Sequence, residues 1–189
     1  MTGLVLAAGA GRRFGRPKAV VDFRGARLVD HAVALLHAGG CERVVVVSGA
    51  VELDVPGAEV VHNPLWQTGM GSSLRAGLTA VGAEDAVVVP VDMPWLGAES
   101  VRRVMAADAP LAVATYGGVR AHPVLLGASH HAAIIASAVG DAGARHHLRE
   151  HSHEVREVPC DGTGSPRDID HPADLGDDGG PPGGPTGGH

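Results

Sequence analysis

The sequence predicts an α/β protein with a Rossmann-like, three-layer αβα architecture, in which helices cover both faces of a mostly parallel sheet. Two observations lead to this prediction. Short, valine-rich apolar runs of strand length recur along the chain, and segments with apolar residues at helical spacing lie between them. Alternating strands and helices are typical of parallel sheets, because each crossover between parallel strands has room for a helix.

The elements can be placed in order along the chain. The first strand is expected at residues 4–8, where an apolar run ends at Gly9. A helix is expected over 28–37, because its apolar residues recur at helical spacing ahead of Gly39 and Gly40. Further strands are expected at 43–47, 59–61, 86–91, 111–115, 123–126 and 155–159, and further helices at 72–81, 99–107, 129–139 and 144–150. Ligands of such sheets bind beyond the carboxyl ends of the strands, which makes candidates of Gly9, Ser48, Asn63 and Asp92.

Composition narrows the class of protein. The 189 residues fit one domain, expected over 1–175, followed by a disordered tail at 176–189 that contains seven glycines and three prolines. The net charge of −6 argues against nucleic-acid binding, which needs a basic surface. The chain has no apolar stretch of 18 residues and begins without a signal-peptide pattern, so we expect a cytoplasmic protein without a membrane partner. Two distant cysteines exclude a disulfide scaffold.

A glycine-rich, cationic loop follows the first strand. Residues 6–18 read LAAGAGRRFGRPK and contain Lys18, the one lysine of the chain. Glycines allow backbone N–H groups to approach a phosphate, and arginine and lysine neutralise its charge. A P-loop is excluded because the lysine follows a proline and precedes an alanine. A dinucleotide-binding loop is disfavoured because Phe14 replaces the third glycine and Pro17 would interrupt the helix.

The loop resembles the signature of the MobA-like nucleotidyltransferases, which move NMP from an NTP to a phosphorylated acceptor. This resemblance implies catalytic roles for Arg13 and Lys18, which would hold the phosphates, together with Asp92. It also implies nucleotide binding by the whole loop, namely Leu6, Ala7, Ala8, Gly9, Gly11, Arg13 and Lys18.

Two acidic segments extend the resemblance. Asp92 lies in the segment VDMP, and Asp170 lies in the segment DIDHPADL that begins at residue 168. In the family these positions hold the metal, so the resemblance implies that Asp92 and Asp170 bind Mg²⁺, a hard cation that prefers oxygen ligands. Each acid also has a structural alternative: Asp92 could cap a turn, and Asp170 could cap a helix.

Three further segments resemble a narrower branch, the molybdenum cofactor cytidylyltransferases. They span 63–74, 117–125 and 140–145. The resemblance implies that Gly71, Ser72 and Ser73 contact the nucleoside, and that His122, Asp141 and Arg145 face the acceptor. CTP is then the favoured NTP and molybdopterin the expected phosphorylated acceptor. A transient contact with a molybdoenzyme or its chaperone would follow.

Alternatives remain open at this stage. A guanylyltransferase or a sugar-1-phosphate nucleotidyltransferase would share the fold and the phosphate loop. An NAD(P)-dependent oxidoreductase would need the dinucleotide loop disfavoured above, and an accessory protein would bind nucleotide without turnover. Six histidines at 130, 131, 146, 147, 151 and 153 are expected to be solvated helix side chains. A transition-metal site among them is the alternative, because residues 147 and 151 are four apart.

Overall fold

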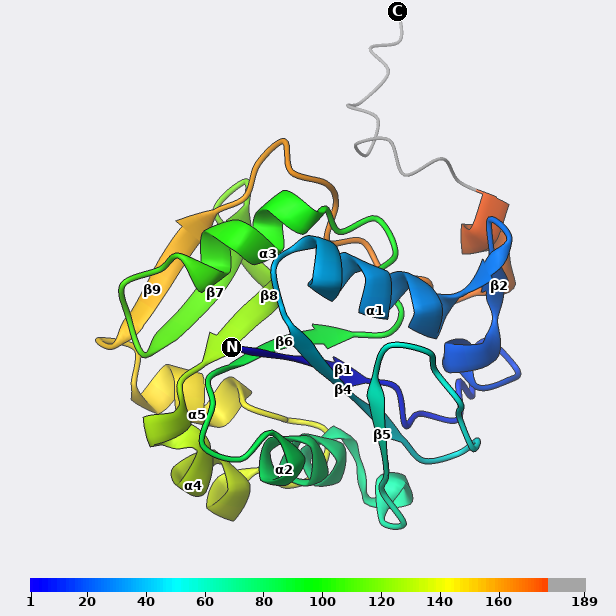
Figure 1. Ribbon diagram of the computed structural model, residues 1–189, viewed down its shortest axis with the longest axis horizontal. Helices are drawn as coiled ribbons and strands as arrows, with labels where there is room; N and C mark the ends of the chain where they lie inside the picture. The colour runs from blue at the N-terminus through cyan, green and yellow to red at the C-terminus, as the bar shows by residue number, and fades with distance from the viewer. Residues whose placement is uncertain (177–189) are drawn as a thin grey trace, which may run out of the picture.

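The computed structural model describes residues 1–176 and arranges them in three layers around one seven-stranded sheet (Figure 1). The strand order is β5-β4-β1-β6-β8-β7-β9. All neighbouring pairs are parallel except those that β8 makes with β6 and β7. The strands are β1 (Thr2–Leu6), β4 (Arg43–Ser48), β5 (Glu59–His62), β6 (Ala86–Pro90), β7 (Leu111–Tyr116), β8 (Val119–Leu126) and β9 (Val155–Pro159).

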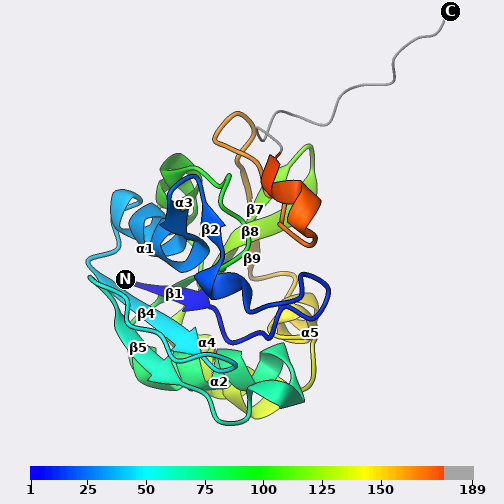
Figure 2. The same cartoon turned by 90° about the vertical axis from the view of Figure 1, so that its right-hand side faces the viewer.

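Helices cover both faces of this sheet. In both views α1 (Leu28–Ala38) and α3 (Ala98–Met105) lie on one face, while α2 (Met70–Val81) and α4 (Ala128–Ser137) lie on the other (Figures 1 and 2). The short helix α5 (Arg145–Glu150) packs beside α4. The predicted three-layer α/β class with a mostly parallel sheet is therefore confirmed.

Alternation along the central strands creates two hydrophobic cores. In β4, Val44 and Val46 pack on the side of α1 and α3, whereas Val45 and Val47 pack on the side of α2 and α4. Both sets are buried, as the period of two along a strand requires when each face is covered. Full burial of one such side chain contributes roughly 1.5–3 kcal/mol, so the valine-rich runs stabilise both layers at once.

The topology places a crevice beside β1. Strands β4 and β5 are added on one side of β1, and β6 then pairs with the other side of β1. Because the strand order reverses there, the carboxyl ends of β1 and β6 border the crevice where open α/β sheets bind ligands.

Several boundaries differ from the expectations. Strand β1 ends at Leu6 rather than at residue 8, so two alanines belong to the loop. Strand β8 begins at Val119 rather than at 123 and pairs as a hairpin with β7. The sequence analysis missed a small hairpin, β2 (Asp22–Phe23) and β3 (Ala26–Arg27), whose strands are two residues long and too short for periodicity to detect.

The end of the domain also needs a correction. Gly176 was assigned to the tail, but it ends the 3-10 helix η3 (Pro172–Gly176). The rest of the predicted tail lies outside the described residues. Within residues 1–176, no helix has the length and apolar character needed to cross a membrane.

Candidate active site

The loop after β1 folds back on itself at the edge of the crevice. Gly11 has a φ of +60°, and the N–H of Gly15 donates to its carbonyl oxygen at 2.8 Å. A Cβ at Gly11 would overlap the carbonyl oxygen of Arg16, so this position requires glycine. The loop ends at Lys18, the first residue of the 3-10 helix η1 (Lys18–Val20), and the Lys18 side chain lines the crevice.

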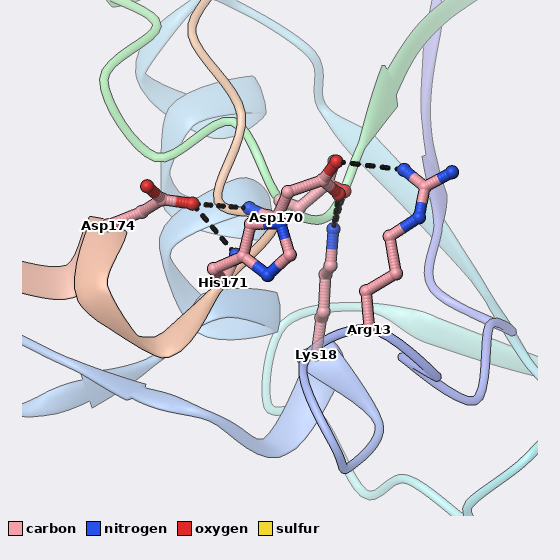
Figure 3. Close-up of polar contacts among 6 residues, drawn as sticks. Arg13, Lys18, Asp170, His171 and Asp174 are labelled. Carbon is pink, nitrogen blue, oxygen red and sulfur yellow. Dashed lines mark hydrogen bonds and ion pairs between the residues drawn. The ribbon is translucent and has the colours of Figure 1, made fainter.

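A second segment brings carboxylates to the same place. Asp92 follows β6 by two residues, and its carbonyl oxygen accepts the N–H of Ile169 at 2.9 Å. This bond docks the C-terminal segment beside the strand end. Asp174 then accepts the backbone N–H groups of Asp170 and His171 at 2.9 and 2.7 Å, which fixes the turn that carries Asp170 (Figure 3).

Lys18 bridges the two carboxylates. Its Nζ lies 2.8 Å from Oδ2 of Asp92 and 2.8 Å from Oδ1 of Asp170. Arg13 Nη1 lies 3.1 Å from the other oxygen of Asp170, so two cations face this carboxylate (Figure 3). Burial works to lower the pKa of Lys18, but its hydrogen bonds to both acids prevail and raise it. The hydrogen bond from Lys18 lowers the pKa of Asp170. Lys18 and Asp170 therefore stay ionised at neutral pH.

A third acid completes a set of oxygen ligands. Carboxylate oxygens of Asp92, Asp168 and Asp170 all lie within 4.8 Å of one another. Three carboxylates at this separation fit Mg²⁺ or another hard divalent cation. Because Lys18 pairs with two of the same carboxylates, a metal ion and this ammonium group compete for them.

A first cavity of about 390 Å³ opens between the loop and these acids. Most of the residues predicted to bind nucleotide line it, namely Leu6, Ala8, Gly9, Gly11, Arg13, Lys18 and Ser73, and so do Asp92 and Asp170. Residues that the sequence analysis did not single out also line it, including Arg12, Trp66, Met70 and Pro90. Arg12 neighbours the predicted Arg13, and Trp66 lies in a segment already linked to the nucleoside.

Three predicted nucleotide-binding residues lie in the framework instead. Ala7 is buried, and its N–H donates to Val47 at 3.0 Å as a continuation of the sheet. The N–H of Gly71 donates to Gly140 at 2.7 Å. Ser72 is buried, and its hydroxyl contacts Asn63 Nδ2 at 2.9 Å and the carbonyl oxygens of Leu65 and Gly69. None of the three lines the first cavity, because each makes hydrogen bonds to neighbouring parts of the framework.

A second cavity of about 230 Å³ adjoins the first. His122 and Arg145, which the family resemblance places toward the acceptor, both line it. Asp141 does not line it; this residue borders the first cavity, where its carboxylate faces the N–H of Met70 at 3.4 Å. His122 Nδ1 donates to the carbonyl oxygen of Val88 at 3.1 Å, and burial lowers its pKa, so the ring is neutral at pH 7.

The two cavities share part of their walls. Leu6, Met70, Pro90 and Asp92 line both. Asp168 lines the second cavity, and Asp170 lines the first. The carboxylate set therefore lies at the junction of two spaces with different linings. Three cations and three carboxylates line the first cavity, and mainly apolar side chains line the second.

The expectation of solvated histidines is wrong for half of the group. His130, His131 and His147 are 9%, 5% and 3% exposed. His130 and His147 are buried where α4 and α5 pack against each other, whereas the ring of His131 lies against the carbonyl oxygens of Gly82 and Leu126 at 3.2 and 3.0 Å. Helical periodicity alone does not reveal these contacts. Burial lowers the pKa of His147, and the neighbouring His151 and His130 act in the same direction.

Residues 3–155 match the family described as the MobA-like NTP transferase domain. The chain belongs to this family. It is a MobA-like nucleotidyltransferase by family and fold, as predicted from the first loop, although Asp168 and Asp170 lie beyond the matched residues.

Curated relatives carry more than one name. "Nicotine blue oxidoreductase" of Paenarthrobacter nicotinovorans is 35% identical over 187 residues, which cover 90% of this chain and 92% of that protein. "Molybdenum cofactor guanylyltransferase" of Xanthomonas euvesicatoria pv. vesicatoria is 38% identical over 105 residues, which cover 56% of this chain and 53% of that protein. The solved structure of Rv0371c from Mycobacterium tuberculosis matches with a TM-score of 0.77 at 25% identity over 92% of this chain and 94% of that one. Rv0371c has also been solved in complex with manganese.

Two glycine substitutions separate the folding of the loop from its contact with ligand. A Cβ at Gly9 meets nothing within 4 Å, so we expect Gly9→Ala to change the free energy of unfolding by less than about 0.5 kcal/mol. The added methyl group projects where phosphate would approach the backbone, so nucleotide affinity falls on the order of tenfold.

Gly11→Ala is expected to lower the free energy of unfolding by about 1–3 kcal/mol through backbone strain, and also to weaken nucleotide affinity. Chemical denaturation and nucleotide titration measure both effects, and equal stability losses would contradict the assignment.

Proposed function

We propose that this MobA-like nucleotidyltransferase transfers NMP from an NTP, with CTP favoured, to the terminal phosphate of a molybdopterin-type acceptor and releases pyrophosphate. The observation that carries the proposal is the position of Asp92, which lies on the shared wall of the two cavities. An NTP in the first cavity and a phosphorylated acceptor in the second would meet beside this carboxylate.

The first cavity has the chemistry of a triphosphate site. Arg12, Arg13 and Lys18 supply positive charge, and the loop around Gly9 leaves backbone accessible. In the proposed complex Lys18 releases the carboxylates and pairs with phosphate oxygens. Arg13 and Lys18 then stabilise the negative charge that accumulates on the departing pyrophosphate.

The carboxylates would hold Mg²⁺. Asp92 and Asp170, with Asp168 beside them, supply oxygen ligands of the type this ion prefers. When bound, the ion supplies charge neutralisation to the phosphates. The manganese complex of Rv0371c supports a divalent cation in this fold.

The acceptor needs orientation more than activation. A phosphate monoester is already ionised near neutral pH, so the site requires no general base for the attacking oxygen. Arg145 provides a cation for its phosphate, and apolar side chains such as Leu74, Val88 and Val124 suit a flat ring system. A contact with a molybdoenzyme or its chaperone would then deliver the product.

The first test is thermal stabilisation by CTP, GTP, ATP and UTP, each with and without Mg²⁺. A ligand at 100 times its Kd raises the free energy of unfolding by about 2.7 kcal/mol. We expect the largest Mg²⁺-dependent shift with CTP, and pyrophosphate release when the acceptor is added. A shift with GTP alone would keep the mechanism and replace the donor. Nucleotide binding without pyrophosphate release would indicate an accessory protein.

A second candidate function is NAD(P)-dependent reduction of an aromatic compound. The relative named nicotine blue oxidoreductase favours it, because the similarity extends over 92% of that protein. The same thermal assay distinguishes the two functions if NADPH and NADH are included. Stabilisation by NADPH without Mg²⁺, together with oxidation of NADPH by a dye, would replace the transferase proposal.

Arg145 provides a test of the acceptor side. We expect Arg145→Ala to raise the KM for the acceptor about tenfold or more, as the loss of a charge-assisted hydrogen bond predicts, with the KM for NTP unchanged. Arg149→Ala is the matched control, since Arg149 is exposed on the same helix and lines neither cavity. Steady-state kinetics with each substrate varied separately measures the effect, and an equal defect toward NTP would remove Arg145 from the acceptor site.

A further inference from the structure

Three histidines converge where α4 meets α5, away from both cavities. His130 comes from α4, His147 comes from α5, and His151 follows the end of α5. His147 and His151 are four residues apart, the spacing that places two imidazoles on one helical face in known zinc sites. Neither the first nor the second cavity is lined by any of the three.

The ring nitrogens are close enough to share one ion. One nitrogen from each ring lies within 4.8 Å of one nitrogen from each of the others. Nδ1 of His130 lies 2.9 Å from Nε2 of His147, and the rings of His147 and His151 stack at 4.0 Å between centroids. Two nitrogens on a tetrahedral zinc ion are about 3.3 Å apart, given Zn–N bonds of about 2.0–2.1 Å. The nitrogens of His130 and His147 would therefore move apart by a few tenths of an ångström to bind the same ion.

Neighbouring groups leave a lone pair on His151 and on His130, and binding of the ion would displace the proton that His147 Nε2 shares with His130 Nδ1. Nδ1 of His151 lies 3.0 Å from the carbonyl oxygen of His147 and donates its proton there, so Nε2 carries the lone pair. Nε2 of His130 lies 3.5 Å from Oε2 of Glu154, which favours a proton on Nε2 and a lone pair on Nδ1. A carboxylate or carbonyl behind a ligating histidine is the usual outer shell of a zinc site.

We propose that His130, His147 and His151 form a structural site for Zn²⁺ or a similar borderline divalent cation, with Glu154 orienting His130. Imidazole ligands select such metals over Mg²⁺, which prefers oxygen. The bound ion fastens α4 to the end of α5. Because α5 begins at Arg145, it also fixes the helix that borders the second cavity.

The test is a Zn²⁺ titration of the full chain, prepared without a histidine tag and stripped with a chelator. The titration is run in excess Mg²⁺ so that the carboxylates of Asp92 and Asp170 do not bind zinc. We expect one Zn²⁺ per chain, a rise in melting temperature on loading, and visible absorption typical of tetrahedral coordination when Co²⁺ is used instead. Absence of stoichiometric binding would overturn the proposal and leave a hydrogen-bonded histidine cluster.

Variants assign the ligands. His151→Gln should weaken Zn²⁺ binding by more than about 100-fold, and Glu154→Gln by about 10–100-fold, as for an outer-shell carboxylate. His146→Gln is the matched control, because His146 is exposed on the same helix and pairs with Glu150. Melting curves in chelator show that each variant is folded. Unchanged Zn²⁺ affinity in His151→Gln, or equal loss in His146→Gln, would contradict the site.

Discussion

Lys18→Ala is expected to lower kcat/KM for nucleotidyl transfer by at least 10²–10³-fold, the cost of removing one charge-stabilising group. Lys18 is the one lysine of the chain, and its Nζ lies 2.8 Å from a carboxylate oxygen of both Asp92 and Asp170. Its four-carbon side chain can move from these acids to phosphate oxygens, which a fixed cation could not do. Lys18→Arg should restore only part of the rate, because the planar guanidinium group fits neither arrangement of a compact ammonium group.

The same substitution is expected to change metal affinity in the opposite direction from the rate. Without nucleotide, Lys18 and a divalent cation compete for the same carboxylates, so the Lys18→Ala variant should bind Mn²⁺ more tightly than the wild-type protein does. Pyrophosphate release measures the rate, and calorimetric titration with Mn²⁺ measures the affinity. Arg16→Ala is the control, because Arg16 is an exposed cation of the same loop that lines neither cavity. A joint fall in rate and metal affinity would show that Lys18 supports metal binding rather than competing with it.

The sequence contained enough information for the fold and for one half of the site. Valine-rich runs and helical spacing predicted the layers, since burial on both faces leaves a pattern that is local in the chain. Asp92 could be placed because it lies two residues beyond the end of β6, and a parallel sheet gathers strand ends at one edge. Asp170 was different: it pairs with a lysine 152 residues away, and only the family resemblance connected them.

The residues that the structure places away from the expected cavity share a physical feature. Ser72 and Asp141 are polar residues beside a predicted ligand site, and polarity alone does not distinguish a cavity wall from a buried hydrogen bond. The hydroxyl of Ser72 lies 2.9 Å from the carbonyl oxygen of Gly69, and Asp141 faces the N–H of Met70 from the side of the first cavity. The buried histidines show the same limit, because their burial depends on how α4 packs against α5 and against neighbouring backbone. Asp168 could have been suspected from the sequence, since it lies two residues before Asp170, but this spacing did not show that both side chains lie close to Asp92.

Asp92→Asn is the second substitution with a large expected effect. It preserves the shape of the side chain but removes its charge, and we expect kcat to fall by about 10²–10³-fold. Asp92 lies on the wall common to both cavities, so the loss should affect turnover rather than the binding of either substrate alone. Asp168 and Asp170 each border one cavity, and their asparagine variants should lose less.

Binding and turnover have to be measured separately to establish this role. In Asp92→Asn, Mg²⁺ should no longer add to the thermal stabilisation by CTP, while CTP alone still binds through Arg13 and Lys18. Lys18 also keeps Asp170 as a partner at 2.8 Å, which holds the loop in place and makes unfolding an inadequate explanation for lost turnover. Asp108→Asn, an exposed acid outside both cavities, should match the wild-type protein in every assay. Near wild-type turnover in Asp92→Asn would remove this carboxylate from the metal site and with it the argument that the two cavities react across it.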